Sequence, residues 1–274
     1  MQPAAPGLPE TPRAAATVVL LRDSTAGPEV LLLRRNAQAS NMAGVYVFPG
    51  GKLDADDATL DADTRLDQPH ATLHANLNEP DTHSATAAGL YVAALREALE
   101  ECGLLLAEPL GGTSAVNATR ARAMLREGQP FAQVLGALQL RLQTRQLAPW
   151  SRWVTPLAPT MGTRRFDTRF FVAQAPADQT ALHDNEETTD SVWLAPRAAL
   201  EQYRDGRIDL APPQIMSLAH LARHGLALWQ GARQEGALPL GRAHLLAKLL
   251  VGHVVGAQQV AVREHVGVLI EREQ

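Results

Sequence analysis

The chain has 274 residues, of which 46% are hydrophobic and 20% charged, and its formal net charge is −4. These values are ordinary for a globular protein built around one large domain. Basic residues are not gathered into a patch, which argues against a nucleic-acid ligand. No apolar run approaches the roughly 18 residues that span a membrane. The single cysteine, Cys102, excludes an intrachain disulfide, which is typical of a reducing compartment. We therefore expect a cytoplasmic protein, and the lack of a long apolar run predicts no membrane partner.

The two ends of the chain differ from its middle. Residues 1–14 are rich in proline, alanine and glycine and are predicted to be a disordered N-terminus. They lack the apolar core of a signal peptide, and the final Glu-Arg-Glu-Gln is not a peroxisomal address. Residues 15–230 are assigned to one folded domain. The extension 231–274, with a helix and a strand expected in it, either adds to that domain or forms a homodimer contact.

A β-hairpin is the first predicted element. Ala15–Arg22 and Val30–Arg34 are β-branched or leucine-rich runs separated by turn residues. Arg34 and Arg35 then end the second strand, close to a glycine turn. Two interpretations of this pair are open: solvated surface arginines, or contacts to phosphate oxygens, which the guanidinium fork matches well.

The glycine turn is Phe48-Pro49-Gly50-Gly51, and a polar segment follows it. Because glycine has no side chain, the backbone at Gly50 and Gly51 can approach a metal ion or a phosphate closely. Residues 58–84 are rich in Asp, Thr, Ala and His and are predicted to be a loop with one helical turn. His70 and His74 have the spacing of a zinc pair, but no third ligand accompanies them.

The next run, from Ala85, predicts a helix that ends at Gly103. Glu97, Glu100 and Glu101 stand at i, i+3 and i+4, so their carboxylates project from one face. One interpretation is a solvated acidic edge. The other is a site for Mg²⁺ or Mn²⁺, since hard oxygen ligands on a rigid helix suit these ions and close like charges need a cation.

A helical segment is predicted at residues 115–143, after a short strand at 104–106. It divides into helices 115–127 and 130–143 at Gly128-Gln129-Pro130. The second helix carries an apolar stripe, which either packs into the core or cradles an acyl chain.

Two further strands are predicted at 150–156 and 165–173, and a third at 188–194. Alternation along the middle one points Arg169 to the same side as Asp167, with Arg165 at its start. The acidic loop 183–187 precedes the third strand, and helices at 195–203 and 213–224 close the domain.

The glycine turn and the acidic helix together resemble the Nudix box, G-x5-E-x7-R-E-U-x-E-E-x-G-U, where U is a bulky apolar residue. Arg96-Glu97 and Glu100-Glu101-x-Gly103-Leu104 match its second half. Asp57, six positions after Gly51, replaces the first glutamate, and Ala98 is small for the first U. The box is also interrupted, because the 38 residues 58–95 stand where the pattern has seven.

An interrupted box after Phe-Pro-Gly-Gly-x-Leu-Asp is similar to the coenzyme A and acyl-CoA diphosphatase branch of the Nudix hydrolases. The resemblance runs from about residue 14 to residue 224. It implies an α/β fold, namely an α/β/α sandwich with a mixed central sheet, to which this chain adds the insertion and extra helices. The insertion 58–84 would lie over or beside the active site, and deleting residues 61–79 is expected to spare folding.

The resemblance also implies roles for the residues singled out above. Glu97 and Glu101 would be the main metal ligands, with Glu100 on a second metal or in the outer shell. Gly50 or Gly51 would add a backbone carbonyl, and Arg96 would orient the glutamates. Glu187, with Glu186 as second choice, would be a further ligand or the general base, although Glu97 or a metal-activated water are alternatives. Substrate phosphates would meet Arg34, Arg35, Arg165 and Arg169.

The expected reaction is hydrolysis of a pyrophosphate bond with Mg²⁺ or Mn²⁺ as cofactor. Coenzyme A or acyl-CoA is the first substrate, giving 3′,5′-ADP and a 4′-phosphopantetheine. ADP-ribose, a dinucleotide or a nucleoside triphosphate is the alternative. A Nudix-fold binding module without turnover is the third hypothesis; Glu97, Glu100 and Glu101 argue against it, and the Asp57 substitution favours it mildly.

Overall fold

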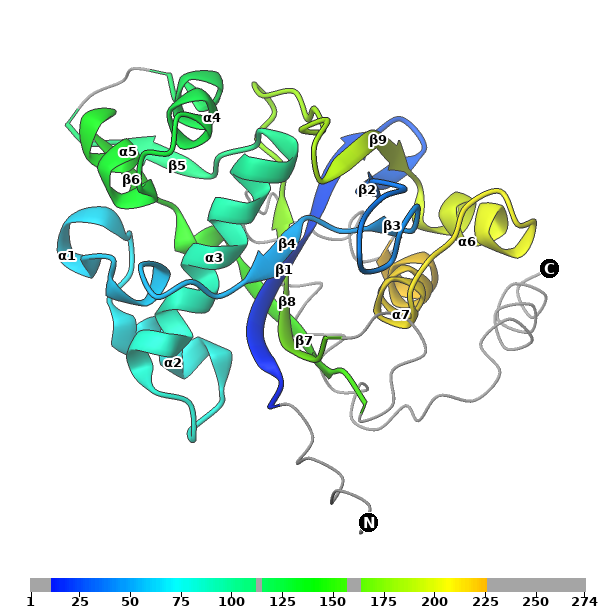
Figure 1. The fold of residues 1–274 in the computed structure, drawn as a ribbon, viewed down its shortest axis with the longest axis horizontal. Coiled ribbons are helices and arrows are strands. Elements are labelled where there is room, and N and C mark those ends of the chain that lie inside the picture. Colours follow the sequence, from blue (N-terminus) through cyan, green and yellow to red (C-terminus); the bar gives the residue numbers. More distant parts are fainter. Residues whose placement is uncertain (1–10, 112–114, 157–163, 226–274) are drawn as a thin grey trace, which may run out of the picture.

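A mixed β-sheet lies at the centre of the computed structural model, which describes residues 11–111, 115–156 and 164–225 (Figure 1). The strands of this sheet are β1 (Arg13–Ser24), β2 (Gly27–Arg35), β3 (Tyr46–Val47), β4 (Gly50–Lys52), β7 (Ala148–Val154), β8 (Phe166–Gln174) and β9 (Thr188–Leu194). Its main path runs β3-β2-β1-β8-β7, with β4 paired to β1 and β9 to β2. Because β1 is parallel to β8 and antiparallel to β2, the predicted mixed sheet is confirmed.

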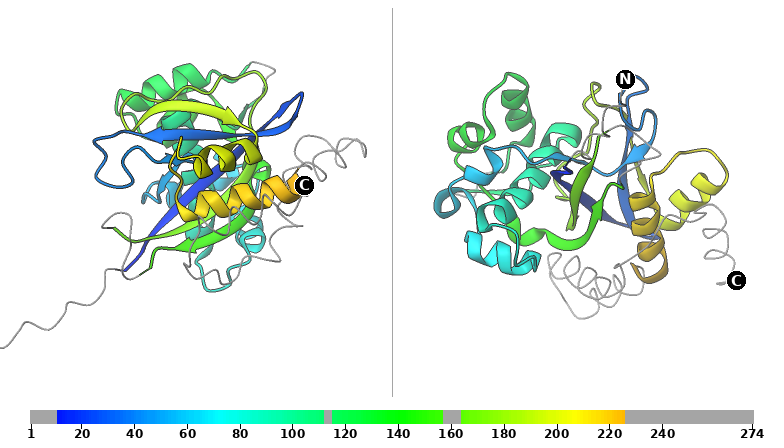
Figure 2. Two further views of the ribbon diagram at one scale, coloured as in Figure 1. Left: turned by 90° about the vertical axis from the view of Figure 1, so that its right-hand side faces the viewer. Right: turned by 60° about the horizontal axis from the view of Figure 1, so that its bottom comes forward.

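The helices lie in two layers and a lateral lobe. They are α1 (Ala62–Arg65), α2 (His70–Leu77), α3 (Ser84–Cys102), α4 (Ala118–Arg126), α5 (Phe131–Ala137), α6 (Pro196–Arg204) and α7 (Pro212–His220), with short turns η1 (Asp57–Thr59), η2 (Thr144–Gln146) and η3 (Leu221–Gly225). Figure 2 shows α6 and α7 over the sheet face opposite to α3. Beside α3, the small sheet of β5 (Ala107–Pro109) and β6 (Leu140–Leu142) joins α4 and α5.

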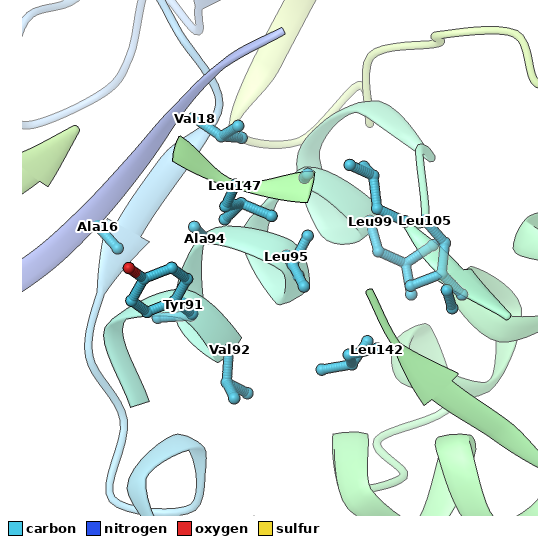
Figure 3. Close-up of a cluster of buried hydrophobic side chains, with 14 of the residues drawn as sticks. Ala16, Val18, Tyr91, Val92, Ala94, Leu95, Leu99, Leu105, Leu142 and Leu147 are labelled. Atoms are coloured by element: carbon cyan, nitrogen blue, oxygen red, sulfur yellow. The ribbon is translucent and has the colours of Figure 1, made fainter. Parts of the chain in front are cut away.

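The central strand β1 separates two hydrophobic clusters. Ala16, Val18 and Leu20 pack with α3 on one face of the sheet, whereas Val19 and Leu21 pack with α6 and α7 on the other. Period-two alternation along β1 therefore determines on which face of the sheet each side chain lies. Figure 3 shows part of the α3 cluster, in which Tyr91 of α3 lies beside Ala16 of β1. These contacts hold the acidic helix against the strand next to the glycine turn.

The interruption of the box is folded, which corrects the expectation of a loop with one helical turn. Leu60, Leu66, Leu73 and Leu77 are buried in the α3 cluster. Leu73 and Leu77 stand one turn apart on α2, so a short helix with one apolar edge packs on α3. Leu66, Leu73 and Leu77 belong to the core, which contradicts the expectation that residues 61–79 can be deleted without loss of folding.

Leu73→Ala is expected to lower the free energy of unfolding by about 2–5 kcal/mol, since the side chain is fully buried and leaves a cavity. The matched control on the same helix is Asn76→Ala, whose side chain is exposed and should change stability by less than about 0.5 kcal/mol. Urea unfolding measures both. Equal midpoints for the two variants would mean that the insertion does not share the core.

The helical segment also differs from its prediction. α4 forms within 115–127, but α5 ends at Ala137 and residues 140–142 become strand β6. Gln139 has a φ of 51°, which interrupts the helix, and Leu140 and Leu142 are buried against the α3 cluster. The strand predicted at 104–106 begins later, at Ala107. The pairing of β5 with β6 accounts for both differences, since it shifts the first strand to residues 107–109 and makes a strand of residues 140–142.

The other elements lie close to their predicted bounds, and alternation along β8 is confirmed. Phe170 packs on the α6 and α7 side, while Phe171 packs on the α3 side. No helix within the described residues is long and apolar enough to cross a membrane. The disordered N-terminus was predicted over residues 1–14, and Arg13 and Ala14 instead begin β1, so the prediction is wrong for these two residues. Residues 1–10 and the elements predicted in 231–274 lie outside the described residues.

Candidate active site

The glycine turn is held by strand pairing near the start of β1. Thr17 pairs with Gly50, and Ala16 pairs with Gly51. A β-carbon on Gly50 would lie 2.5 Å from the Ala16 carbonyl oxygen, and one on Gly51 would overlap the Glu97 carboxylate. Both positions therefore require glycine because of close approach. The turn brings a backbone segment directly against the acidic helix.

Arg96 ties the two halves of the interrupted box together. It is 7% exposed, and its Nε and Nη2 each donate to Asp57 at 2.9 Å. Its Nη1 donates to Glu97 at 2.8 Å and to Glu100 at 3.2 Å. Asp57 thus occupies the place of the first box glutamate despite its shorter side chain. This is the geometry expected of a residue that orients the glutamates.

Glu97 and Glu101 form a buried acidic pair. Glu101 is 3% exposed, and its Oε2 accepts the Gly50 N–H at 3.0 Å. Burial raises the pKa of Glu101 well above its usual range, and the charge of Glu97 adds to the shift. Burial likewise raises the pKa of Glu97 to about 7; Arg96 opposes the shift, and Glu100 and Glu187 reinforce it. Within the described residues Glu101 forms no ion pair.

This pair fits a divalent cation in its chemistry, although the site is not preassembled. Oxygen donors in a negatively charged, buried setting suit Mg²⁺ or Mn²⁺, and such a charge would remove the repulsion between Glu97 and Glu101. The described part of the chain holds no three acidic, histidine or cysteine side chains gathered around one point. Glu100 shares the Nη1 of Arg96 with Glu97, and burial raises its pKa.

A loop before β9 places Glu187 within electrostatic reach of the pair. The Asp184 carboxylate accepts the backbone N–H groups of Glu186, Glu187 and Thr188 at 3.0, 3.2 and 2.8 Å. The Glu187 carbonyl in turn accepts the N–H of Asn36 at 2.8 Å. The charge of Glu187 raises the pKa of Glu97 and of Glu101. Glu187, chosen from the sequence, is therefore close enough to act electrostatically on the box, and its role stays a prediction.

The two arginines that end β2 lie on different faces of the sheet. Arg35 is close enough to lower the pKa of Glu101, and its Nε donates to the Asn41 carbonyl at 3.1 Å. Arg34 is exposed and pairs in register with Tyr46 and Asp190, on the α6 and α7 side. The prediction that both arginines face the site is therefore wrong for Arg34, because neighbouring strand residues alternate.

Arg169 also has a different role from the one predicted. It is 6% exposed and lies in register with Ala16, one strand away from Gly51. Its Nε and Nη2 donate to Glu79 at 3.1 and 2.6 Å, and its Nη1 lies 2.9 Å from Asp167. Because two protein carboxylates already hold the guanidinium, the structure argues against the predicted phosphate contact. Arg165 donates to the carbonyls of Thr155 and Pro156 at 3.1 and 3.2 Å, and its role at the rim stays a prediction.

A pocket of about 230 Å³ adjoins the other side of the acidic helix. Arg96 and Glu100 form its wall next to the box, and α4 and α5 contribute Leu125 and Phe131. Asp54 and Asp56 complete an acidic rim. The helical segment 115–143 thus packs into the core, as one interpretation predicted, and also lines a cavity beside the box. The acyl-chain interpretation stays a prediction.

Sequence reasoning missed three residues that organise the site: Glu79, Asp184 and Arg122. Glu79 lies in the insertion, and its partner Arg169 is 90 positions away, so no local pattern joins them. Asp184 carried a usable signal, because an aspartate ahead of a polar turn often accepts the following backbone N–H groups. Arg122 lies on a short amphipathic helix, where its burial depends on tertiary packing.

Comparison with known proteins shows the family and the fold. A sequence-family model described as the NUDT19 Nudix domain matches residues 11–221. Two curated relatives are named acyl-coenzyme A diphosphatase NUDT19. The one from Xenopus laevis is 27% identical over 232 residues, covering 73% of this chain and 61% of the relative. The one from Homo sapiens is 29% identical over 260 residues, covering 77% and 68%. The chain therefore spans about three fifths of the first relative's length.

A crystal structure of a NUDIX hydrolase from Alicyclobacillus acidocaldarius has the same fold. It matches with a TM-score of 0.65 and 30% sequence identity, covering 78% of this chain and 92% of that one. The family match takes in both halves of the interrupted box, from the glycine turn through Asp57 to the acidic helix. The protein is therefore a member of the NUDT19 Nudix domain family, within the Nudix hydrolases.

Proposed function

We propose that this protein hydrolyses the pyrophosphate bond of coenzyme A or acyl-CoA, with Mg²⁺ or Mn²⁺ as cofactor. The products are 3′,5′-ADP and 4′-phosphopantetheine or its acyl form. The observation that carries the proposal is the buried Glu97–Glu101 pair against Gly50 and Gly51, in a chain whose curated relatives are named acyl-coenzyme A diphosphatases. A small phosphorylated substrate suits this site, because the sheet face at Glu101 also holds Arg35.

The reaction is a phosphoryl transfer to water. The oxygen of water forms a bond to one phosphorus, the bridging P–O bond breaks, and the water loses a proton. The divalent ion would neutralise charge on the phosphate oxygens and favour deprotonation of water. Glu97 and Glu101 would hold it, with Glu100 as a further carboxylate and the carbonyl of Gly50 or Gly51 beside them.

The chain's own residues supply the remaining parts. Arg96 holds Glu97 in place through its contact at 2.8 Å while Asp57 fixes the guanidinium. Arg35 is the arginine best placed to contact a substrate phosphate, since it lies on the Glu101 side of the sheet. Glu187 and Glu97 are the two candidates for the group that accepts the proton of water. The pocket lined by Leu125 and Phe131 offers apolar surface for the pantetheine arm.

A substrate panel tests the proposal. Coenzyme A, an acyl-CoA, ADP-ribose, NADH and a nucleoside triphosphate are incubated with Mg²⁺ or Mn²⁺, and product masses are read directly. Release of 3′,5′-ADP from the first two is the expected result. Preference for ADP-ribose, NADH or the triphosphate would support the hydrolase activity but contradict coenzyme A or acyl-CoA as its substrate. Absence of turnover across the panel would favour a binding module.

Gly51→Ala tests whether the glycine turn sets the Glu97 carboxylate. The added β-carbon overlaps that carboxylate, so Glu97 must move and kcat should fall about 10²-fold. Thermal stability and kcat on the best panel substrate are measured together. Gly136→Ala is the matched control, since its β-carbon meets only Arg65 at 3.4 Å. A kcat within about twofold of the wild type would show that Glu97 needs no close backbone approach.

A further inference from the structure

Arg122 of α4 is a buried cation that the proposed reaction does not use directly. It is 9% exposed, and each of its three guanidinium nitrogens donates to a main-chain carbonyl. Nε donates to Glu100 O at 3.1 Å, and Nη2 donates to Glu100 O at 2.8 Å and to Glu101 O at 3.0 Å. Nη1 donates to Leu182 O at 2.9 Å. Within the described residues Arg122 forms no ion pair, and burial lowers its pKa.

The carbonyls of Glu100 and Glu101 lie in the last turn of the acidic helix, where intrahelical donors run out. The chain leaves the helix through Gly103, which has a φ of 73°. The N–H groups that follow donate to acceptors other than the Glu100 and Glu101 carbonyls. Gly103 and Leu104 donate to Leu99 and Ala98, and Leu105 donates to the Gln179 side chain. A cation at this end is favourable because of the helix dipole. Arg122 therefore completes the turn that carries the two glutamates.

The same guanidinium reaches the loop that carries Glu187. Its bond to Leu182 O lies beside the bond from Leu182 N–H to Cys102 O, which is 2.9 Å long. One turn further along α4, Arg126 donates to Asp184 O at 3.0 Å. Asp184 then accepts the N–H of Glu187. Two arginines of α4 thus tie the end of the box helix to this loop: Arg122 bonds Glu101 O and Leu182 O, and Arg126 bonds Asp184 O.

We propose that Arg122 is a positioning residue, which fixes the end of the box helix and the Glu187 loop relative to each other. The inference rests on the proposed function, since it assigns Arg122 to the same site. The carbonyl contacts leave the carboxylates of Glu100 and Glu101 free for their own partners. Because Arg122 contacts only main-chain atoms here, its loss should change the placement of groups that act in the reaction and leave substrate affinity nearly unchanged.

Arg122→Gln is the principal variant, and Arg120→Gln is its matched control, because Arg120 is exposed on the same helix. With the best panel substrate, Arg122→Gln should lower kcat about 10²-fold and leave KM within about twofold. Arg122→Lys keeps the charge and should recover part of the loss. The control should match the wild type. A loss of kcat that only follows the unfolded fraction, measured by circular dichroism, would overturn the proposal.

A double-mutant cycle with Glu187→Gln separates positioning from general stability. If Arg122 acts by placing Glu187, Arg122→Gln should cost much less kcat in the Glu187→Gln background than in the wild type. Additive losses would overturn the proposal.

Hydrogen exchange provides a readout that needs no substrate. Amides 184–188 should lose protection in Arg122→Gln and keep it in Arg120→Gln. Unchanged protection would overturn the positioning role even if the panel shows turnover. Lost protection in a chain that hydrolyses nothing would leave the structural link intact and reject the proposed reaction instead.

Discussion

Glu101→Gln is expected to lower kcat by about 10²- to 10⁴-fold, because it removes a carboxylate that would hold the divalent ion. The amide keeps an oxygen for the Gly50 N–H, which donates to Glu101 at 3.0 Å. The fold should therefore persist, and circular dichroism should match that of the wild type. Full activity of this variant would remove Glu101 from the reaction.

The same substitution should stabilise the protein in EDTA at neutral pH. The folded state raises the pKa of Glu101 above its ordinary value of 4.5, so it binds this proton more tightly than the unfolded chain does. The free energy of unfolding therefore falls as the pH rises from about 4.5 through the folded pKa of Glu101. Glutamine has no such proton to lose, so the free energy of unfolding of the variant does not fall in this way. Melting temperatures of the two proteins should nearly coincide near pH 4.5 and diverge toward pH 8, with the variant higher. A variant that melts lower than the wild type at pH 8 would contradict the buried-charge account.

Arg169→Ala is expected to lower the free energy of unfolding by about 3–5 kcal/mol, since it leaves buried carboxylates without their cation. Arg169 links Glu79 in the insertion to Asp167 on β8, and its own side chain is 7% exposed. Arg207→Ala is the control: Arg207 also pairs with an aspartate, Asp205, but its side chain is 59% exposed. Exposed pairs contribute at most about 1 kcal/mol. Urea unfolding of both variants measures the difference.

The Arg169 effect should depend on pH in a defined direction. Burial opposes ionisation of Glu79, but the hydrogen bond and charge of Arg169 hold its pKa below the ordinary value of 4.5. Stability from this pair is present above that pH and is lost as the pH falls through the folded pKa. The difference in free energy of unfolding between the wild type and Arg169→Ala should therefore become smaller below about pH 4.5. If Arg169→Lys stays folded and yet raises KM, Arg169 contacts the substrate after all.

Local patterns predicted the parts of the site that depend on short stretches of chain. The spacing of Glu97, Glu100 and Glu101 placed them on one helix, and two glycines marked a close backbone approach. Both features follow from helix periodicity and from the absence of a side chain, so they need no knowledge of the rest of the fold. Asp57 was also identified, because its distance from Gly51 is local even though its partner Arg96 is not.

The sequence-based predictions that differ from the structure depend on contacts between segments far apart in the chain. Alternation gave the correct face for Arg169, but its partner Glu79 lies in the insertion, so the occupied guanidinium could not be foreseen. Arg34 and Arg35 appeared equivalent because adjacent arginines look alike in sequence, although a strand directs them to opposite faces. The helix predicted through residue 143 gave way to β6, since pairing with β5 buries Leu140 and Leu142.

The 38-residue interruption also affects how the site forms during folding. Asp57 and Arg96 must meet across a long loop, whereas an uninterrupted box joins them across seven residues. Loop-closure entropy grows with the logarithm of length, so the longer loop costs roughly 1.5 kcal/mol more to close. Packing of Leu66, Leu73 and Leu77 on α3 supplies contacts that offset this cost. The acidic helix can therefore form early from local interactions, but the complete box assembles only as the insertion folds onto it.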